Sequence, residues 1–301
     1  MNKSEMTAKI ADGQGFIAAL DQSGGSTPKA LKGYGVEDGA WSGDEAMFGL
    51  IHDMRARIIL SPAFTGDKVI GAILFERTMD GQAGGVSVPQ ALADKGVVPF
   101  LKIDKGLEDE ANGVQLMKPM PELDTLLARA TKLGIFGTKE RSVVNLANRE
   151  GIAAIVEQQF EIADQVLAHG LMPIIEPEVN IKSAERADAD AILLDELVKA
   201  LDTLTGDDKI MLKLSLPEKA GLFQPLVDHP RVLRVVALSG GFARTEACVE
   251  LAKNPGIIAS FSRALLSDLR VQMSEEEFDA ALGQAIDEIH CASTEKTPVA
   301  A

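Results

Sequence analysis

The sequence predicts a single (β/α)8 TIM barrel, and three observations support that prediction. Eight near-continuous apolar runs rich in β-branched residues follow one another along the chain, as expected for parallel strands buried on both faces. Helical patterns separate these runs, and the alternation fills about 250 residues, the usual size of such a barrel. A doubly wound sheet fits less well, because its first strand is usually followed by a phosphate loop. The nearest match, Gly13 to Ala18, begins before the first strand.

The strands are expected where the apolar runs lie. A further short run, Ile58–Leu60, is interpreted as the end of a helix. In chain order, the eight expected strands are Phe16–Asp21, Val69–Glu76, Val97–Asp104, Ile135–Val144, Leu171–Glu178, Ile210–Ser215, Val232–Ser239 and Ile257–Arg263.

The helices are expected between the strands, and two of them begin with a recognisable cap. Ser42 with Glu45, and Ser274 with Glu277, have the spacing of a capping box, in which both side chains bind backbone N–H groups at a helix start. Glycines end two of the others, as is common at helix C-termini. The remaining expected helices carry Leu123 to Ala130 before Gly134, Ile155 to Leu167 before Gly170, and Ile192 to Leu204.

The whole alternation belongs to one domain. We expect the catalytic barrel to occupy residues 1–291. The last segment, residues 292–301, is polar and ends in small residues, so we expect a flexible C-terminal tail there.

Composition excludes several classes of protein. The net charge of −15 repels nucleic acid and anionic membranes, and aromatic residues make up only 4% of the chain. No apolar run is long enough for a membrane span, and the N-terminus has no apolar signal segment. The two cysteines lie far apart and are interpreted as reduced thiols. We therefore expect a cytoplasmic enzyme that binds a small molecule and neither nucleic acid nor membrane.

Metal and nucleotide sites are not expected. The four histidines, His52, His169, His229 and His290, are scattered and form no zinc-binding pattern. No Walker loop is present, so ATP hydrolysis is not expected. The sequence thus predicts chemistry without a metal or a cofactor.

Charged residues gather where the strands end, which is where a barrel carries its function. Each of them singly also fits an ordinary role in a turn or on the surface, but together they suggest an anionic ligand. Two small-residue loops, Ser23–Ser26 and Ser239–Gly241, can offer backbone N–H groups to phosphate. The charged residues at the strand ends are Asp21, Lys102, Lys139, Arg141, Glu176, Glu178, Lys213 and Arg263.

Lys213 is the most informative of these residues. It lies between Leu212 and Leu214 within an apolar strand, and lysine is rarely buried without a partner. Burial disfavours the ammonium form, and a neutral amine attacks carbonyls to form a Schiff base. The ligand predicted from the residues is an anionic carbonyl compound that carries one or two phosphates.

The chain resembles the class I, Schiff-base fructose-bisphosphate aldolases, in particular their shorter bacterial form, from about Phe16 to Ala264. Each motif alone is weak, but their order and separations together are specific. The motifs are Ala19-Leu20-Asp21-Gln22-Ser23-Gly24-Gly25-Ser26, Leu101-Lys102-Ile103-Asp104-Lys105-Gly106, Ile175-Glu176-Pro177-Glu178, Leu212-Lys213, Leu238-Ser239-Gly240-Gly241 and Phe261-Ser262-Arg263.

The resemblance implies catalytic roles. Lys213 is expected to attack the ketone at C2, and Glu176 to act as the acid/base of carbinolamine dehydration and C3–C4 cleavage. Asp21 is expected to support proton transfer, and Lys139 to keep Lys213 neutral by its charge. Glu178 is expected to orient Lys139.

The resemblance also implies two phosphate sites. The C1-phosphate site is expected at Ser239, Gly240, Gly241 and Arg263. The distal phosphate is expected at Ser23, Ser26, Lys102 and Arg141.

The sequence departs from the family pattern at three places. Many eukaryotic members end in a tyrosine implicated in enamine protonation, whereas the only tyrosine here is Tyr34. Lys29-Ala30 stands where the family often has Lys-Arg, and Glu140 replaces a tryptophan between Lys139 and Arg141. The outward face of the strand is the expected place for Glu140.

The expected reaction is the reversible, metal-independent cleavage of fructose 1,6-bisphosphate to dihydroxyacetone phosphate and glyceraldehyde 3-phosphate, in glycolysis or gluconeogenesis. Two alternatives stay open. One is another Schiff-base sugar-phosphate lyase, such as a transaldolase or a monophosphate aldolase. The other is a non-catalytic barrel that binds sugar phosphates. The oligomeric state, monomer or homo-oligomer, is not decided by the sequence.

Overall fold

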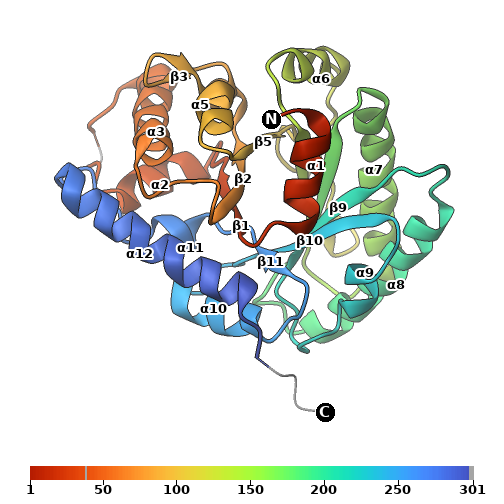
Figure 1. The fold of residues 1–301 in the computed structure, drawn as a ribbon. Coiled ribbons are helices and arrows are strands. Elements are labelled where there is room, and N and C mark those ends of the chain that lie inside the picture. The colour runs from red at the N-terminus through yellow and green to blue at the C-terminus, as the bar shows by residue number, and fades with distance from the viewer. Residues whose placement is uncertain (38, 298–301) are drawn as a thin grey trace.

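Eight parallel strands form a nearly closed barrel in the computed structural model, which describes residues 1–37 and 39–297 (Figure 1). The strands neighbour one another in chain order, and the backbone N–H of Ala19 donates to the C=O of Phe261 where the last strand meets the first. The predicted (β/α)8 barrel is therefore confirmed. The strands are β1 (Phe16–Leu20), β2 (Val69–Leu74), β5 (Val98–Lys102), β7 (Gly137–Val144), β8 (Met172–Val179), β9 (Ile210–Ser215), β10 (Val232–Leu238) and β11 (Ile258–Ala259).

Alternate residues of the strands point into the barrel and fill it. The inner cluster includes Ile17, Phe100, Ile174 and Met211 from four different strands. Strand residues between them pack outward against the helices, because successive side chains of a strand point to opposite faces. The middle of the barrel is thus a packed apolar core. The buried charged side chains of Lys139, Glu176 and Lys213 lie nearer the C-terminal ends of their strands than this core does.

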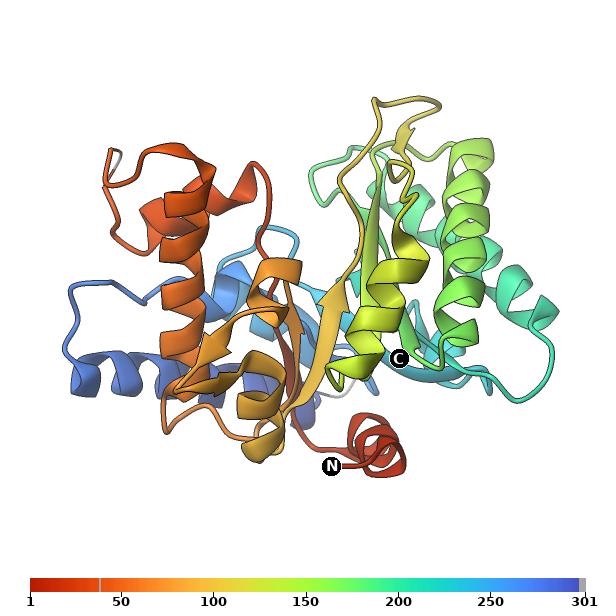
Figure 2. The same cartoon turned by 90° about the horizontal axis from the view of Figure 1, so that it is seen from above.

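A helix covers the end of the barrel at which the strands begin. Helix α1 (Lys3–Asp12) contributes Ile10 to the inner cluster, and Met6 packs against it. Arg234 of β10 donates to the backbone C=O groups of Ala11 and Gly13 and so holds the end of this helix. Figure 2 shows α1 on the side opposite to the strand arrowheads.

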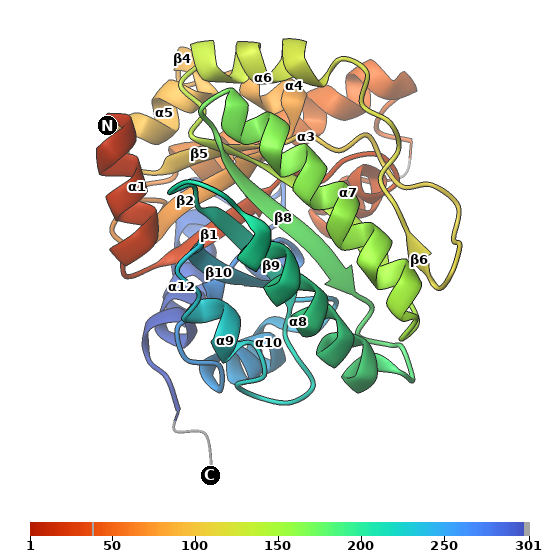
Figure 3. The same ribbon diagram turned by 90° about the vertical axis from the view of Figure 1, so that its right-hand side faces the viewer.

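The outer layer consists of amphipathic helices that pack on the outward-facing strand residues. Figure 3 shows α7 and α8 lying against β8, and the same packing recurs around the barrel. The main helices of this layer are α3 (Gly43–Leu60), α5 (Val88–Asp94), α6 (Leu123–Lys132), α7 (Arg149–Ala168), α8 (Arg186–Thr203), α10 (Arg244–Ala252) and α12 (Glu275–Thr294).

Short elements that the apolar pattern did not predict lie in the connections. They are too short to show a period of their own. They are the helices α2 (Ser26–Gly33), α4 (Glu76–Met79), α9 (Gln224–Val227) and α11 (Arg263–Leu266), the antiparallel pair β3 (Gln82–Ala83) and β4 (Val86–Ser87), and β6 (Val114–Gln115), which pairs with β7.

Four of the expected boundaries can be compared directly. The run at residues 58–60 is the end of α3, as interpreted, and Ser274 with Glu277 forms a complete capping box. Ser42 is the N-cap of α3 but its side chain makes no cap hydrogen bond, so the capping box expected there is wrong. The Glu45 carboxylate, the other half of the expected box, pairs with Arg77 at 2.7 Å instead. The eighth strand is also shorter than expected, because Arg263 already begins α11.

The chain after α12 contacts the end of the barrel where the strands begin. Helix α12 continues through Thr294, and the Lys296 ammonium donates to the backbone C=O groups of Leu251, Ile257 and Ala292. Ile257 comes just before β11. Burial, followed by the charge of Arg234, lowers the pKa of Lys296 to about 8. Residues 298–301 of the expected tail lie outside the described residues.

Among the described residues, no helix has both the length and the apolar character that a membrane crossing requires.

Candidate active site

Four ionisable side chains are buried together at the end of the barrel where the strands finish. Lys139 lies on β7, Glu176 on β8 and Lys213 on β9, while Asp21 directly follows β1. Their exposed fractions are 3%, 3%, 4% and 8%, respectively. The parallel strands bring these four residues together although up to 192 positions of sequence separate them (213 − 21).

Glu176 lies between the two lysines. One of its oxygens, Oε1, is 3.0 Å from the Nζ atom of Lys213, and the other, Oε2, is 2.8 Å from the Nζ atom of Lys139. Lys139 also pairs with Oδ2 of Asp21 at 2.8 Å. The four groups thus form one chain of contacts, Lys213–Glu176–Lys139–Asp21, with two positive and two negative charges.

Burial and charge act in opposite directions on these groups. Burial disfavours the ionised carboxylates, but the charges of Lys139 and Lys213 outweigh it and hold the pKa values of Asp21 and Glu176 below their usual range. Burial likewise disfavours the Lys139 ammonium, but the carboxylates of Asp21 and Glu176 prevail and raise its pKa above the ordinary value. Lys139 is therefore a fixed positive charge, and both carboxylates are held in their ionised form.

Two expected contacts differ from the structure. The charge of Lys139 was expected to act directly on Lys213, whereas the Glu176 carboxylate lies between them and offsets that repulsion. Glu178 was expected to orient Lys139, but it pairs with the guanidinium of Arg141. The reason is strand geometry: Glu178 lies two residues beyond Glu176 on β8, and Arg141 lies two residues beyond Lys139 on β7. The Glu178–Arg141 pair therefore repeats, one step further along, the diagonal contact of Glu176 with Lys139.

Lys102 is held at the end of β5 by a residue that the sequence analysis did not single out. Its ammonium donates to Oδ1 of Asp104 at 2.7 Å and to the C=O of the same residue at 2.9 Å. Burial lowers the pKa of Lys102, against the opposing charge of Asp104. Asp104 lies within a quoted motif, and its position two residues after Lys102 is the signal that could have identified it.

The residues expected to bind the C1-phosphate lie together. Gly240 and Gly241 have φ angles of 60° and 118°, a conformation that favours glycine. A side chain at Gly241 would come within 3.5 Å of the Arg263 guanidinium, so this arginine lies against the glycine turn. Ser239 is buried at the end of β10. The structure thus joins an arginine and a glycine loop, a combination suited to phosphate.

The Ser23–Ser26 loop forms a compact turn after β1. The backbone N–H of Ser23 donates to the Ser26 hydroxyl at 3.0 Å, and that hydroxyl donates to the C=O of Ser23 at 2.8 Å. Gln22, just before this turn, donates from its amide Nε2 to the hydroxyl of Ser262 at 2.6 Å. The loop therefore lies beside the segment that carries Arg263.

Glu140 is fully buried on the face of β7 opposite to Lys139. Burial raises its pKa well above the ordinary value, so the neutral carboxyl is favoured there. Glu140 therefore adds no charge between Lys139 and Arg141 when it is protonated. Within the part of the chain that the structure describes, no group of three or more histidine, cysteine, aspartate or glutamate residues could hold a metal ion.

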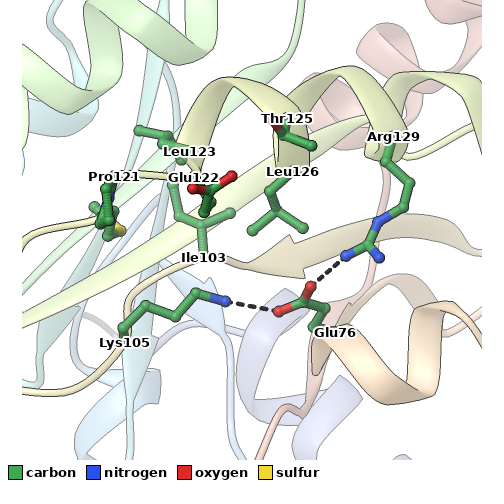
Figure 4. Close-up of a pocket in the computed structure, with 10 residues that line it drawn as sticks. Glu76, Ile103, Lys105, Pro121, Glu122, Leu123, Thr125, Leu126 and Arg129 are labelled. Carbon is green, nitrogen blue, oxygen red and sulfur yellow. Dashed lines mark hydrogen bonds and ion pairs between the residues drawn. The ribbon is translucent and has the colours of Figure 1, made fainter.

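A cavity of about 380 Å³ lies outside the barrel mouth, between the end of β5 and α6 (Figure 4). Its wall is mainly apolar and includes Ile103, the residue between Lys102 and Asp104 in the sequence. Its two cations, Lys105 and Arg129, both pair with Glu76. Arg129 also pairs with Asp80, so two carboxylates balance the two cations and the cavity does not add to the phosphate sites.

Comparison with solved structures first supports the fold. The chain is similar to a fructose-bisphosphate aldolase from Plasmodium falciparum, with a TM-score of 0.79 at 19% identity over 98% of this chain and 96% of that one. At this identity the likeness supports the shared barrel fold only. A sugar phosphate isomerase/epimerase from Parabacteroides distasonis matches at a TM-score of 0.45 and 10% identity over 95% of this chain and 97% of that one, which is too weak to carry an argument.

The family follows from a second comparison. Residues 3–217 match the family model described as glycolytic, fructose-bisphosphate aldolase class-I. The match spans most of the chain, and the protein therefore belongs to the class I fructose-bisphosphate aldolase family. It is a Schiff-base aldolase, and so a lyase.

Proposed function

We propose that the protein cleaves fructose 1,6-bisphosphate reversibly to dihydroxyacetone phosphate and glyceraldehyde 3-phosphate, through a Schiff base on Lys213 and without a metal. The observation that carries this proposal is the Glu176 carboxylate, which lies 3.0 Å from Lys213 and 2.8 Å from Lys139 in a buried setting. A nucleophile, an acid/base and a fixed charge are thereby in contact.

The first step is formation of the imine. Glu176 accepts a proton from the Lys213 ammonium, and the neutral amine attacks C2 of the ketone. The attacking nitrogen then gives one of its two protons to the C2 oxygen, which produces the carbinolamine. The protonated Glu176 then returns its proton to the departing C2 hydroxyl, which leaves as water. Because the two groups are already 3.0 Å apart, this transfer needs no rearrangement.

The second step is cleavage. A carboxylate, Glu176 with support from Asp21, removes the proton of the C4 hydroxyl. The C3–C4 electron pair moves into the protonated imine, which gives a neutral enamine and releases the aldehyde. Lys139 stays charged throughout, because Asp21 and Glu176 hold its pKa high, and it balances the carboxylates as the proton moves.

The phosphates fix the sugar at its two ends. Ser239, Gly240, Gly241 and Arg263 bind the C1-phosphate in this proposal. Ser23, Ser26, Lys102 and Arg141 contribute to the distal phosphate, and Glu178 orients Arg141. The composition supports a cytoplasmic location, and the family match supports a place in the route between hexose and triose phosphates, glycolysis or gluconeogenesis.

One experiment tests the substrate and the nucleophile together. Cleavage rates are compared for fructose 1,6-bisphosphate and fructose 1-phosphate, and the protein is treated with dihydroxyacetone phosphate and borohydride before peptide mapping. We expect a clear preference for the bisphosphate and label on Lys213 alone. Label on Lys213 with equal rates would support a monophosphate aldolase, and label on Lys102, Lys105 or Lys139 would refute the proposed nucleophile.

A further inference from the structure

A fully buried arginine lies behind the end of β1, outside the residues assigned above. Arg55 of α3 is only 1% exposed, and among residues 1–37 and 39–297 no carboxylate forms an ion pair with it. Burial lowers its pKa to about 10, and the nearby charge of Asp21 opposes this shift. A guanidinium in such a place is costly unless its donors are used, so its hydrogen bonds indicate why it is there.

The donors of Arg55 join the ends of two neighbouring strands. Nη1 donates to the hydroxyl of Thr78 at 2.7 Å, in the helix that follows β2. Nη2 donates to the backbone C=O of Gln22 and to its side-chain Oε1, the latter at 3.2 Å. The guanidinium also lies 5.9 Å from the ring centre of Phe75. Arg55 therefore fixes both the backbone and the side chain of the residue that follows Asp21.

Gln22 carries this constraint to the neighbouring segment that follows β11. Its amide Nε2 donates to the hydroxyl of Ser262 at 2.6 Å and to the C=O of Ala19 at 3.2 Å, while its Oε1 accepts from Arg55. Ser262 directly precedes Arg263. One glutamine amide thus connects β1, the buried arginine and the segment of the C1-phosphate site.

We propose that Arg55, acting through Gln22, is a positioning residue of the aldol reaction. It holds Asp21 in its 2.8 Å contact with Lys139 and keeps the Ser262–Arg263 segment at a fixed distance from that carboxylate. Its own charge adds to the positive field that keeps Asp21 ionised. This inference rests on the proposed function, in which Asp21 supports the proton transfers.

The test is a double-mutant cycle between Arg55 and Asp21, read as kcat for fructose 1,6-bisphosphate. Arg55→Lys keeps the charge but cannot reach Thr78 and both oxygens of Gln22 together. We expect it to lower kcat about tenfold in the wild-type background, because small displacements of a reacting group are costly. In the Asp21→Asn background we expect a further loss below about twofold, since the carboxylate to be positioned is already absent.

Arg234→Lys is the matched control. Arg234 is a partly buried arginine whose guanidinium donates to two backbone carbonyls at the opposite end of the barrel. The Arg234→Lys substitution should leave kcat within about twofold of its value in each background, while it lowers the melting temperature. A kcat of Arg55→Lys that matches the wild type, or that falls by the same factor in both backgrounds, would overturn the inference.

A second variant covers the case in which Arg55→Lys does not fold. Gln22→Ala removes only the amide that links Arg55 to Ser262, and we expect it to lower kcat and to raise KM for the bisphosphate. Wild-type values of both constants would refute the inference. Wild-type protein that cleaves no ketose phosphate would instead refute the proposed function, so the two failures are distinguishable.

Discussion

Replacement of Glu176 by glutamine tests the centre of the proposed mechanism. The carboxylate is 3% exposed and contacts two ammonium groups, so the buried group of Asp21, Glu176, Lys139 and Lys213 has no net charge. Glu176→Gln leaves a net charge of +1 there and removes the group that moves the proton. We expect kcat to fall by about 10²-fold to 10³-fold, the scale of general acid–base catalysis.

The same change should also affect stability. Removing one partner from a buried ion pair costs about 3–5 kcal/mol, and we expect the lower end because Asp21 remains to pair with Lys139. Coupled-assay turnover and urea unfolding measure the two effects separately. Borohydride with dihydroxyacetone phosphate should still label Lys213, but more slowly.

Glu178→Gln is the control for that experiment. Glu178 lies on the same strand two residues further on and pairs with Arg141, so we expect a loss in kcat below about tenfold and a rise in KM. Wild-type turnover in Glu176→Gln, or a larger loss in Glu178→Gln, would move the acid/base role away from Glu176.

Four further predictions follow from the structure. Lys213→Met and Lys213→Arg should abolish cleavage and borohydride labelling while phosphate binding persists, which equilibrium binding of dihydroxyacetone phosphate checks; residual cleavage would require another nucleophile. Turnover should survive a strong chelator, because the imine takes the electron pair of the broken bond; loss with EDTA and recovery with zinc would contradict this. Deletion of Glu295–Ala301 should leave turnover within about twofold but lower the melting temperature, since three backbone carbonyls lose the Lys296 ammonium that donates to them. Burial raises the pKa of Asp190 to about 6. Between about pH 4 and pH 6, Asp190 is therefore protonated in the folded protein but ionised in the unfolded chain. The free energy of unfolding consequently falls as the pH rises through that window. Asp190→Asn should remove this dependence and be more stable than the wild type by about 1–3 kcal/mol at pH 7 but not at pH 4, by urea unfolding; an unchanged pH profile would refute the assignment.

The barrel could be predicted from the sequence because its strands are buried on both faces. Such strands appear as unbroken apolar runs, and their boundaries fall within a few residues of β1, β2, β5, β7, β8, β9 and β10. The short β11 could not be delimited, because the apolar residues Ile257 and Phe261 lie outside the two residues that pair. Apolar character reports burial, and burial continues after the strand has ended.

The charged residues of the mouth could be predicted for a related reason. In a barrel the strand ends converge, so Asp21, Lys139, Glu176 and Lys213 could be grouped without any knowledge of their contacts. The contacts themselves depend on how far each side chain reaches. The pairing of Glu178 with Arg141 rather than with Lys139 is a result of strand register, which the sequence does not reveal.

Arg55 shows why the supporting residues could not be predicted. Arg57 lies two positions away on the same helix, and no sequence pattern distinguishes the two. The structure turns Arg55 inward to Gln22 and Thr78, whereas Arg57 pairs with Glu275 near the surface. Positions two apart on a helix point in nearly opposite directions, so a small rotation of α3 decides which arginine is buried.

The location of α1 and Lys296 at the end of the barrel away from the mouth has a practical consequence. An enzyme attached to a bead, an electrode or a fusion partner works only if its opening faces the solution. A linker joined ahead of α1 would emerge on the far side from Lys213, and so would one joined after Thr297, whose backbone N–H donates to the C=O of Ala252. Either attachment would orient the molecules on a support with their substrate entrance outward.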